Sequence, residues 1–402
     1  LSTIKNMKNQ KSIISIARKE YAQKQAVKRR IQKYYVGQRT KNGLKSLEKI
    51  KAYLPDEYNF FQMERGIVFS HLGMEPIIEL IAQCKEFTVV SGLNPSSPLH
   101  LGHKGLFDVL LNLQKLGARV YLPMTNDETY FDDKAQSLAE SRSKAYEVVI
   151  PEIISFGFDS ANTHIFVDTD YPDLYLFALK VSKHISPSLL KRVFGEEALS
   201  NVGQVFYRGA VQVAQILLPQ LPEFGGPKHT LIPVGIDQHP YILIARDVAK
   251  KLGMIPPSEL VMKFEQSLLD PEQKMSGSKP QTAIYLSDTE VDIKTKIQKA
   301  YTGGVSVLSV HQELGGIPEI CSVFSLLYFH CPEEKLVTDI YKRYKKGQIK
   351  MDELKKITTD FITQLVKENQ TAKKKVTKKL ISKFILNKNL KSILKDEKGG
   401  EK

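Results

Sequence analysis

Two histidines, His100 and His103, are the first residues in this sequence whose spacing suggests chemistry. They lie between an apolar, β-branched run that predicts a buried strand and a stretch with the apolar spacing of a helix. The first turn of a helix presents unpaired N–H groups and the positive end of its dipole, and two imidazoles beside it can donate hydrogen bonds to a phosphate. Gly102 leaves the backbone open to a nucleotide. The segment favours phosphate chemistry, with a histidine pair that merely begins a helix as the alternative.

A lysine segment about 170 residues downstream strengthens the phosphate interpretation. Residues 274–278 read Lys-Met-Ser-Gly-Ser and lie in a short polar stretch that ends at Pro280. A lysine on a mobile loop is a point charge that can follow a migrating pyrophosphate. We therefore expect His100, His103 and Lys274 to act together on one ATP molecule by stabilising the charge that develops on its phosphates.

The two segments resemble the signatures of class I aminoacyl-tRNA synthetases, which are usually described as His-Ile-Gly-His and Lys-Met-Ser-Lys-Ser. The similarity extends over roughly residues 60 to 385 and favours tryptophanyl-tRNA synthetases of the archaeal and eukaryotic branch. The segments between the two signatures that carry this resemblance are 212–214, 216–221, 224–228, 232–240 and 245–249. The resemblance implies that ATP, with Mg²⁺ on its triphosphate, activates L-tryptophan as an adenylate, and that tRNA(Trp) then takes the aminoacyl group. It also implies a homodimer.

The polar residues that we expect to bind substrate follow predicted strands, whose carboxyl ends share one edge of a parallel sheet. Those expected to contact ATP are Pro95, Ser96, Gly102, His103, Asp237, Lys274, Met275, Ser276 and Ser278. By resemblance, those expected to contact the amino acid are Glu128, which takes the α-ammonium group, and Gln212, Gln215 and Gln238. No residue is expected to hold a metal ion of its own.

The sequence departs from the family at three positions. Many eukaryotic relatives hold the indole N–H with a tyrosine and a glutamine, where this chain has Val90 and Pro123, so Gln215 is our candidate acceptor. Tyrosyl enzymes usually carry a tyrosine and an aspartate at Val90 and Gln215, which counts against tyrosine as the substrate. The second lysine of the loop signature is replaced by Gly277, so that either Lys279 compensates or Lys274 suffices alone.

The expected architecture is α/β, with a doubly wound, Rossmann-like parallel sheet followed by an all-α C-terminal domain. A chain of 402 residues exceeds one ordinary core. We expect a leader at 46–86 that packs on the catalytic domain, a catalytic domain at 87–300 with a helical insertion at about 130–200, and a helical anticodon-binding domain with a basic tail at 301–402.

Positive charge is concentrated at the two ends of the chain. The net charge of +14 divides into +12 for residues 1–45, +8 for 366–402 and −6 for the remainder. Basic ends on an acidic body predict a polyanion partner. For residues 1–45, solvated disorder, contact with RNA and organellar targeting stay open.

Composition limits where the protein works. No apolar run approaches the ~20 residues of a membrane span, which excludes the membrane classes. The three cysteines have no paired spacing, so a reducing cytoplasm is the simplest location. Three other functions remain: a tyrosyl enzyme, a catalytically silent RNA-binding paralogue, and a nucleotidyltransferase that does not use tRNA.

Overall fold

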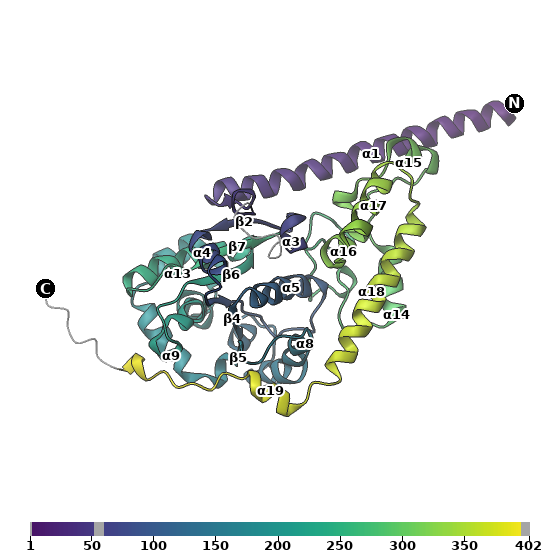
Figure 1. The fold of residues 1–402 in the computed structure, drawn as a ribbon. Helices are drawn as coiled ribbons and strands as arrows, with labels where there is room; N and C mark the ends of the chain where they lie inside the picture. The colour runs from purple at the N-terminus through teal and green to yellow at the C-terminus, as the bar shows by residue number, and fades with distance from the viewer. Residues whose placement is uncertain (1, 52–59, 395–402) are drawn as a thin grey trace. The chain divides into compact units, whose positions relative to one another are not determined.

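The computed structural model describes residues 2–51 and 60–394, and these form two compact units (Figure 1). The sheet unit comprises the described residues of 42–98, 106–262 and 372–394. The helical unit comprises residues 2–41, 99–105 and 263–371. The histidine segment and the lysine segment therefore belong to the same unit, the helical one.

A mostly parallel sheet forms the centre of the sheet unit. In the described residues it has seven strands, in the order β1-β2-β7-β6-β3-β4-β5. Their bounds are β1 (Lys45–Ser46), β2 (Val68–Leu72), β3 (Phe87–Val90), β4 (Ala118–Met124), β5 (Thr163–Val167), β6 (Thr230–Gly235) and β7 (Ser258–Met262). The five strands from β7 to β5 are parallel, which confirms the expected fold class. The leader, expected to pack on this domain, instead contributes β2 to the sheet, antiparallel to β7.

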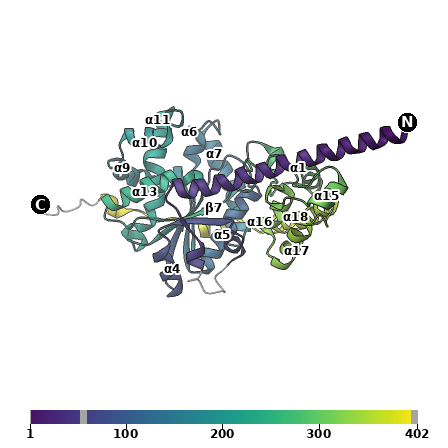
Figure 2. The same ribbon diagram turned by 90° about the horizontal axis from the view of Figure 1, so that it is seen from above.

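The strand order reverses between β3 and β6. From β3 the chain passes through α5 (Leu101–Lys115) to β4 on one side, and from β6 it passes through α13 (His239–Lys251) to β7 on the other. Because such crossovers are right-handed, opposite directions of travel place the two helices on opposite faces of the sheet. Figure 2 shows helices on both sides of the strands. The carboxyl ends of β3 and β6 thus form a switch point, where ligands of such sheets bind.

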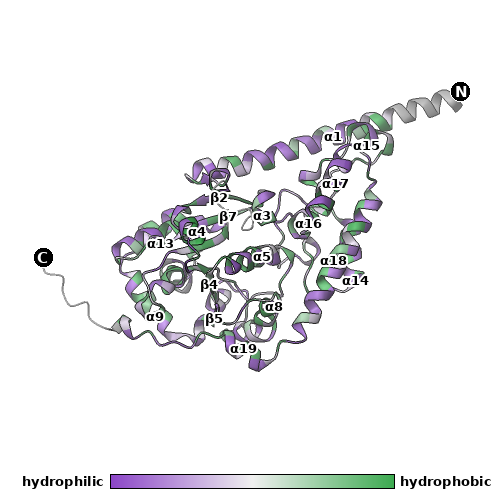
Figure 3. Cartoon of the chain, in the orientation of Figure 1, coloured by the Kyte–Doolittle hydropathy of each residue, from purple (hydrophilic) through white to green (hydrophobic). Residues whose placement is uncertain are grey.

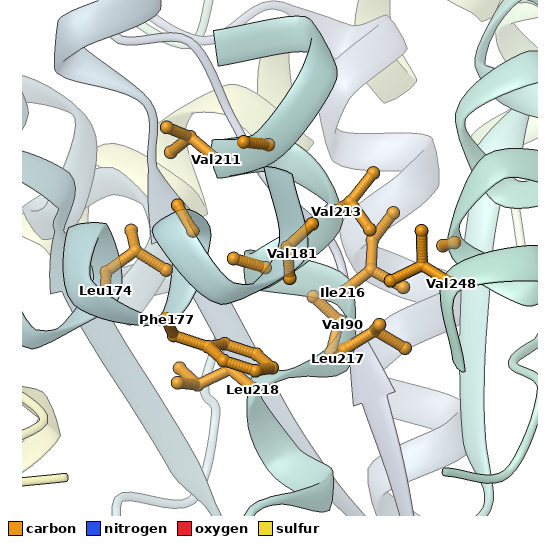
Figure 4. Close-up of a cluster of buried hydrophobic side chains, with 14 of the residues drawn as sticks. Val90, Leu174, Phe177, Val181, Val211, Val213, Ile216, Leu217, Leu218 and Val248 are labelled. Atoms are coloured by element: carbon orange, nitrogen blue, oxygen red, sulfur yellow. The ribbon is translucent and has the colours of Figure 1, made fainter. Parts of the chain in front are cut away.

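An apolar core packs α9 (Pro172–Ser182) and α12 (Gln212–Leu217) against the sheet (Figure 4). Val90 of β3, Phe177 of α9 and Leu217 of α12 are almost completely buried. Full burial of each such side chain contributes about 1.5–3 kcal/mol. This core fixes α12, which carries two of the predicted substrate-binding glutamines, beside the end of β3.

Short helices complete the sheet unit. They are α2 (Glu48–Lys51), α3 (Phe61–Glu64), α4 (Glu75–Ala82), α6 (Asn126–Phe131), α7 (Leu138–Lys144), α8 (Ile150–Ser155), α10 (Pro187–Phe194), α11 (Val202–Phe206) and α19 (Lys378–Phe384). The stretch expected to be mostly helical, 130–200, also contains β5. After α19 the chain returns to this strand, where the Leu386 N–H donates to the Ile165 carbonyl at 2.7 Å.

The helical unit contains the N-terminal helix α1 (Ser2–Lys41) and the helices that follow β7. The latter are α14 (Glu290–Lys299), α15 (Leu308–Leu314), α16 (Ser322–His330), α17 (Glu334–Lys345) and α18 (Met351–Lys373). The described part of α1 is largely hydrophilic (Figure 3), yet Ala17 is fully buried in a small cluster with Val305 and Val310. Residues 12–41, whose side chains the structure describes, are therefore helical and packed at Ala17 rather than solvated and disordered. Within the described ranges, no helix is long and apolar enough to cross a membrane.

Candidate functional site

His100 and His103 lie side by side at the start of α5. His103 is in the first turn of the helix, and His100 immediately precedes the helix. Their ring centroids are 3.8 Å apart. The backbone N–H of His100 donates to Nδ1 of His103 at 3.2 Å, which leaves Nε2 of the neutral His103 ring to carry its proton.

Both imidazoles are neutral at physiological pH. Burial, with smaller contributions from His103 and Lys274, lowers the pKa of His100 to about 2. Burial, followed by the charge of Lys274, lowers the pKa of His103 to about 4. The lysine is thus close enough to act on both rings, and the structure brings the two predicted segments together. The histidines offer N–H donors, while the full positive charge comes from Lys274.

Lys274 lies on a short hairpin. The Ser267 N–H donates to the Gln273 carbonyl at 2.9 Å, and the Met275 N–H donates to the Glu265 carbonyl at 3.0 Å. Lys274 is exposed and its ammonium lies 4.9 Å from the centre of the Phe264 ring, whereas the next residue, Met275, is buried. Because Met275 is buried, the backbone beside Lys274 is held in place. The exposed Lys274 side chain can therefore reach a ligand.

The turn after Lys274 is also ordered. The hydroxyls of Ser276 and Ser278 are 2.9 Å apart, and Lys279 is exposed. The hydroxyl of Tyr285 donates to the Gly277 carbonyl at 2.7 Å. Thus the residue that replaces the second signature lysine is held through its backbone rather than through a side chain.

Tyr285 also connects this turn to the histidines. The Leu101 N–H donates to the Ile284 carbonyl, and the Leu286 N–H donates to the Leu99 carbonyl, both at 2.9 Å. The backbone on each side of Tyr285 is therefore paired with the histidine segment. Sequence reasoning missed this residue because nothing in its local pattern distinguishes it from an ordinary core tyrosine.

Gly102 is required by the packing of the histidines. A Cβ atom at this position would lie 3.0 Å from Cε1 and 3.1 Å from Nδ1 of His100, and 3.6 Å from Cβ of Met275. The first two distances are tighter than nearly all Cβ contacts, so any side chain would displace the imidazole. The missing side chain at Gly102 therefore leaves room for the His100 ring, in addition to leaving the backbone open to a nucleotide, as expected from the sequence.

A second polar cluster occupies the sheet unit, where β4 ends and α6 begins. The carboxylate of Glu128 accepts hydrogen bonds from the Thr125 hydroxyl at 3.0 Å and from the Asn94 amide at 3.3 Å. Burial raises the pKa of Glu128 above its ordinary value. Asn94 follows β3 and Thr125 follows β4. Residues after the ends of two strands therefore position the Glu128 carboxylate.

The predicted glutamines meet near the same strand ends. Gln212 donates from Nε2 to Oε1 of Gln238 at 3.1 Å, and its own buried Oε1 finds no donor among the described residues. Gln215 lies one helical turn further along α12 and is buried. Asp237 is exposed just after β6. In the loop after β3, Pro95 is buried and Ser96 half-buried.

A buried pair of acids adjoins Gln215 and was not predicted. Burial, and then the carboxyl group of Asp127, raises the pKa of Asp168 well above its ordinary range, so Asp168 holds the proton of the pair. Asp127 also accepts a hydrogen bond from the Tyr175 hydroxyl at 3.0 Å. The amide Nε2 of Gln215 donates to Oδ2 of Asp168 at 2.5 Å. Asp168 directly follows β5, so the rule that ligands bind at strand ends would have found it had β5 been predicted.

A parallel sheet with a switch point and a histidine–lysine cluster are features of nucleotide-binding α/β enzymes. A family of this kind, described as tRNA synthetases class I (W and Y), matches residues 82–383. The chain belongs to this family.

Named relatives and solved structures extend the comparison. The tryptophan–tRNA ligase of Methanocaldococcus jannaschii is 35% identical over 352 residues, which cover 85% of this chain and 94% of the relative. That of Pyrobaculum calidifontis is 36% identical over 320 residues, covering 79% and 84%. The tryptophanyl-tRNA synthetase structure from Aeropyrum pernix K1 superposes with a TM-score of 0.80 at 28% identity, covering 88% of this chain and 96% of that one.

Proposed function

We propose that the protein is a tryptophan–tRNA ligase, which activates L-tryptophan with ATP and transfers it to tRNA(Trp). The observation that carries the proposal is that the histidine pair and Lys274 are joined through Tyr285 in one unit of a class I synthetase chain. The relatives described above carry that name.

In the first step the tryptophan carboxylate attacks the α-phosphorus of ATP, and pyrophosphate leaves. We assign His100 and His103 to donate neutral N–H groups to the phosphate oxygens and Lys274 to supply positive charge as the pyrophosphate departs. Mg²⁺ enters with the triphosphate, as part of the substrate. Asp237 accepts hydrogen bonds from the ribose hydroxyls, while Pro95, Ser96, Gly102, Met275, Ser276 and Ser278 line the nucleotide.

In the second step the terminal ribose hydroxyl of the tRNA attacks the carbonyl carbon of the adenylate, and AMP leaves. No covalent intermediate with the protein is needed, because positioning and electrostatics suffice. The helical C-terminal region would bind the anticodon end. The exposed Lys374, Lys375, Lys378 and Lys379, which belong to the sheet unit, would contact phosphates of the tRNA. Lys373 is not in this set because it pairs with the buried Glu152 at 2.9 Å. We further assign the enzyme to the cytoplasm as a homodimer.

For the amino acid, we assign Glu128 to the α-ammonium group and Gln212 and Gln238 to the polar end of the substrate. Gln215 is assigned to the indole N–H. An amide can donate or accept, and the hydrogen bond from its Nε2 to Asp168 commits the Nε2 side to donation. Oε1 is then the atom left to accept from a ring N–H, and this geometry supports tryptophan over a substrate whose ring carries no such donor.

Pyrophosphate exchange into ATP tests the function directly. We expect exchange with tryptophan, little with tyrosine, and charging of tRNA(Trp) by the same preparation. Exchange with tyrosine alone would make this a tyrosyl enzyme. No exchange with either amino acid, together with retained tRNA binding, would make it a silent RNA-binding paralogue, and exchange without charging would favour another nucleotidyltransferase.

The role of Gln215 is tested with β-(3-benzothienyl)alanine, in which sulfur replaces the indole N–H. A site built around one such hydrogen bond rejects an analogue that lacks it by up to roughly 10⁴–10⁵. Asp168→Ala removes the acceptor of the Gln215 amide and so frees that amide to rotate, and we expect the ratio of kcat/KM for tryptophan over the analogue to fall about tenfold or more. The ratio cancels any loss of folded enzyme. An unchanged ratio in Asp168→Ala and in Gln215→Leu would remove both residues from ring recognition.

A further inference from the structure

The N-terminal helix α1 makes two groups of contacts within the helical unit. Its first group is an anchor on residues near α15. Arg18 pairs with Glu313 through two contacts of 2.8 and 3.0 Å, and the Tyr21 hydroxyl donates to the Leu314 carbonyl at 3.0 Å. With Ala17 buried beside them, these residues fix the position of the helix.

The second group lies on the hairpin that carries Lys274. Arg30 donates two hydrogen bonds to the carboxylate of Glu272, which lies two residues before Lys274. Nε donates to Oε1 at 2.7 Å and Nη2 donates to Oε2 at 2.6 Å. The Tyr35 hydroxyl accepts a hydrogen bond from the Phe264 N–H at 3.2 Å, at the other end of the hairpin. The ring of Phe264 is the one over which the Lys274 ammonium lies.

A third contact reaches the hairpin through one intermediate. Lys28 pairs with Glu319 at 2.7 Å, and the backbone carbonyl of Glu319 accepts a hydrogen bond from Gln266 at 2.8 Å. Gln266 is paired across the hairpin with Lys274 itself. Three side chains within two turns of α1 therefore converge on both ends and the middle of one hairpin.

We propose that α1 is a brace for the catalytic loop, and that Arg30 and Tyr35 are positioning residues which act on ATP through Lys274. Arg18 and Arg30 are twelve residues apart, which is about 18 Å along a helix. The helix thus transmits a fixed position from its anchor to the hairpin. The proposal rests on the role of Lys274 in the proposed function for its kinetic test only.

The effect of an ion pair on stability and its effect on rate differ enough to distinguish a positioning role of Arg30 from a merely stabilising one. An exposed ion pair contributes only about 0–1 kcal/mol to folding, so loss of either the Arg18 or the Arg30 pair should leave global stability nearly unchanged. A displacement of about 1 Å in a catalytic group, in contrast, can cost up to roughly 10²-fold in rate. When the Arg18 pair is lost, Ala17 and Tyr21 still hold the anchor, whereas loss of the Arg30 pair releases the hairpin directly. Only the pair on the hairpin should therefore affect catalysis.

The kinetic experiment compares Arg30→Glu with the matched control Arg18→Glu, since each variant breaks an arginine–glutamate pair that an arginine of α1 makes through two hydrogen bonds. We expect Arg30→Glu to lower kcat for pyrophosphate exchange about tenfold with KM for the amino acid unchanged, and Arg18→Glu to stay within about twofold of the parent. Adding Glu272→Arg to Arg30→Glu restores the pair with its charges exchanged and should recover most of the rate. Equal losses in the two single variants, or no recovery in the exchanged pair, would overturn the proposal.

Hydrogen exchange measured by mass spectrometry needs no substrate and keeps the brace testable whatever the enzyme activates. Amides of residues 263–275 should exchange faster in Arg30→Glu and in Tyr35→Phe than in Arg18→Glu. If the hairpin is loosened but the parent enzyme exchanges pyrophosphate with neither amino acid, the proposed function fails and the brace stands. If protection of the hairpin is the same in all three variants, the brace is wrong.

Discussion

The hydroxyl of Tyr285 donates a 2.7 Å hydrogen bond to the carbonyl of Gly277, three residues beyond Lys274. The residues on each side of Tyr285 are paired by backbone hydrogen bonds with Leu99 and Leu101, which flank His100. One aromatic residue therefore sets the spacing between the imidazoles and the ammonium group. This explains how a loop without the usual second lysine is kept in place.

Tyr285→Phe removes only this hydroxyl and should lower kcat for pyrophosphate exchange by about two- to tenfold, since a lost hydrogen bond is worth about 0.5–1.5 kcal/mol. Tyr21→Phe is the control, because the Tyr21 hydroxyl also donates to a backbone carbonyl in the same unit. Both variants should unfold at similar urea concentrations, but only the first should be slow. Equal rates would show that Tyr285 merely packs.

Lys274→Ala should reduce kcat for exchange by roughly 10²–10³-fold, which is the usual loss when one group that stabilises transition-state charge is removed. The exposed Lys279, five residues along the same turn, provides the comparison. We expect Lys279→Ala to cost less than about tenfold, because the lysine whose charge acts on His100 and His103 is Lys274. The reverse order of the two effects would identify Lys279 as the residue that compensates for Gly277.

Gly102→Ala places a methyl group 3.0 Å from Cε1 of His100 and should displace the ring, so that exchange activity falls by about 10²-fold. Gly105→Ala lies one turn along the same helix, where the nearest atoms are 3.7 and 3.8 Å away in Phe329 and His330. That variant should keep full activity and gain up to about 1 kcal/mol of helix propensity. Rate measurements and thermal melts of the two proteins check both statements, and a fully active Gly102→Ala would contradict the first.

The pH dependence of stability reports on His103. Its pKa is about 4 in the folded protein and near 6.5 when unfolded, so the folded state binds fewer protons between these values. The stabilisation is complete above pH 6.5 and is lost as the pH falls toward 4, by at most about 1.4 kcal/mol per pH unit. The free energy of unfolding of His103→Gln should therefore fall less steeply over this window. If the free energies of unfolding of the parent and of His103→Gln depended on pH in the same way, burial would not lower the pKa of the His103 ring.

Much of the sheet was predictable because its signals are local. The strand at Thr230–Gly235 and the strand–helix–strand unit around His103 follow from apolar periodicity and a glycine stop at Gly117. In contrast, β2 joins the sheet through antiparallel pairing with β7, nearly 200 residues away in the sequence, and no local pattern encodes that partner.

The candidate site divides in the same way. Histidine and lysine signatures are local, whereas Tyr285 and Asp168 matter only because the fold places them against Gly277 and Gln215. For a related reason, the sequence alone did not decide whether the segment that forms α1 is ordered. It is strongly charged, and the residues that it contacts, such as Glu272 and Glu313, lie far along the chain.

The return of the chain's end to β5 has a consequence for synthesis. β5 is the outermost strand on its side of the sheet, and the residue that meets Ile165 there is Ile385, about 220 residues later. An unpaired strand edge invites association with other chains. On the ribosome, this edge therefore stays uncovered until residue 385 has been translated, and nascent chains halted before residue 377 should be those that chaperones retain.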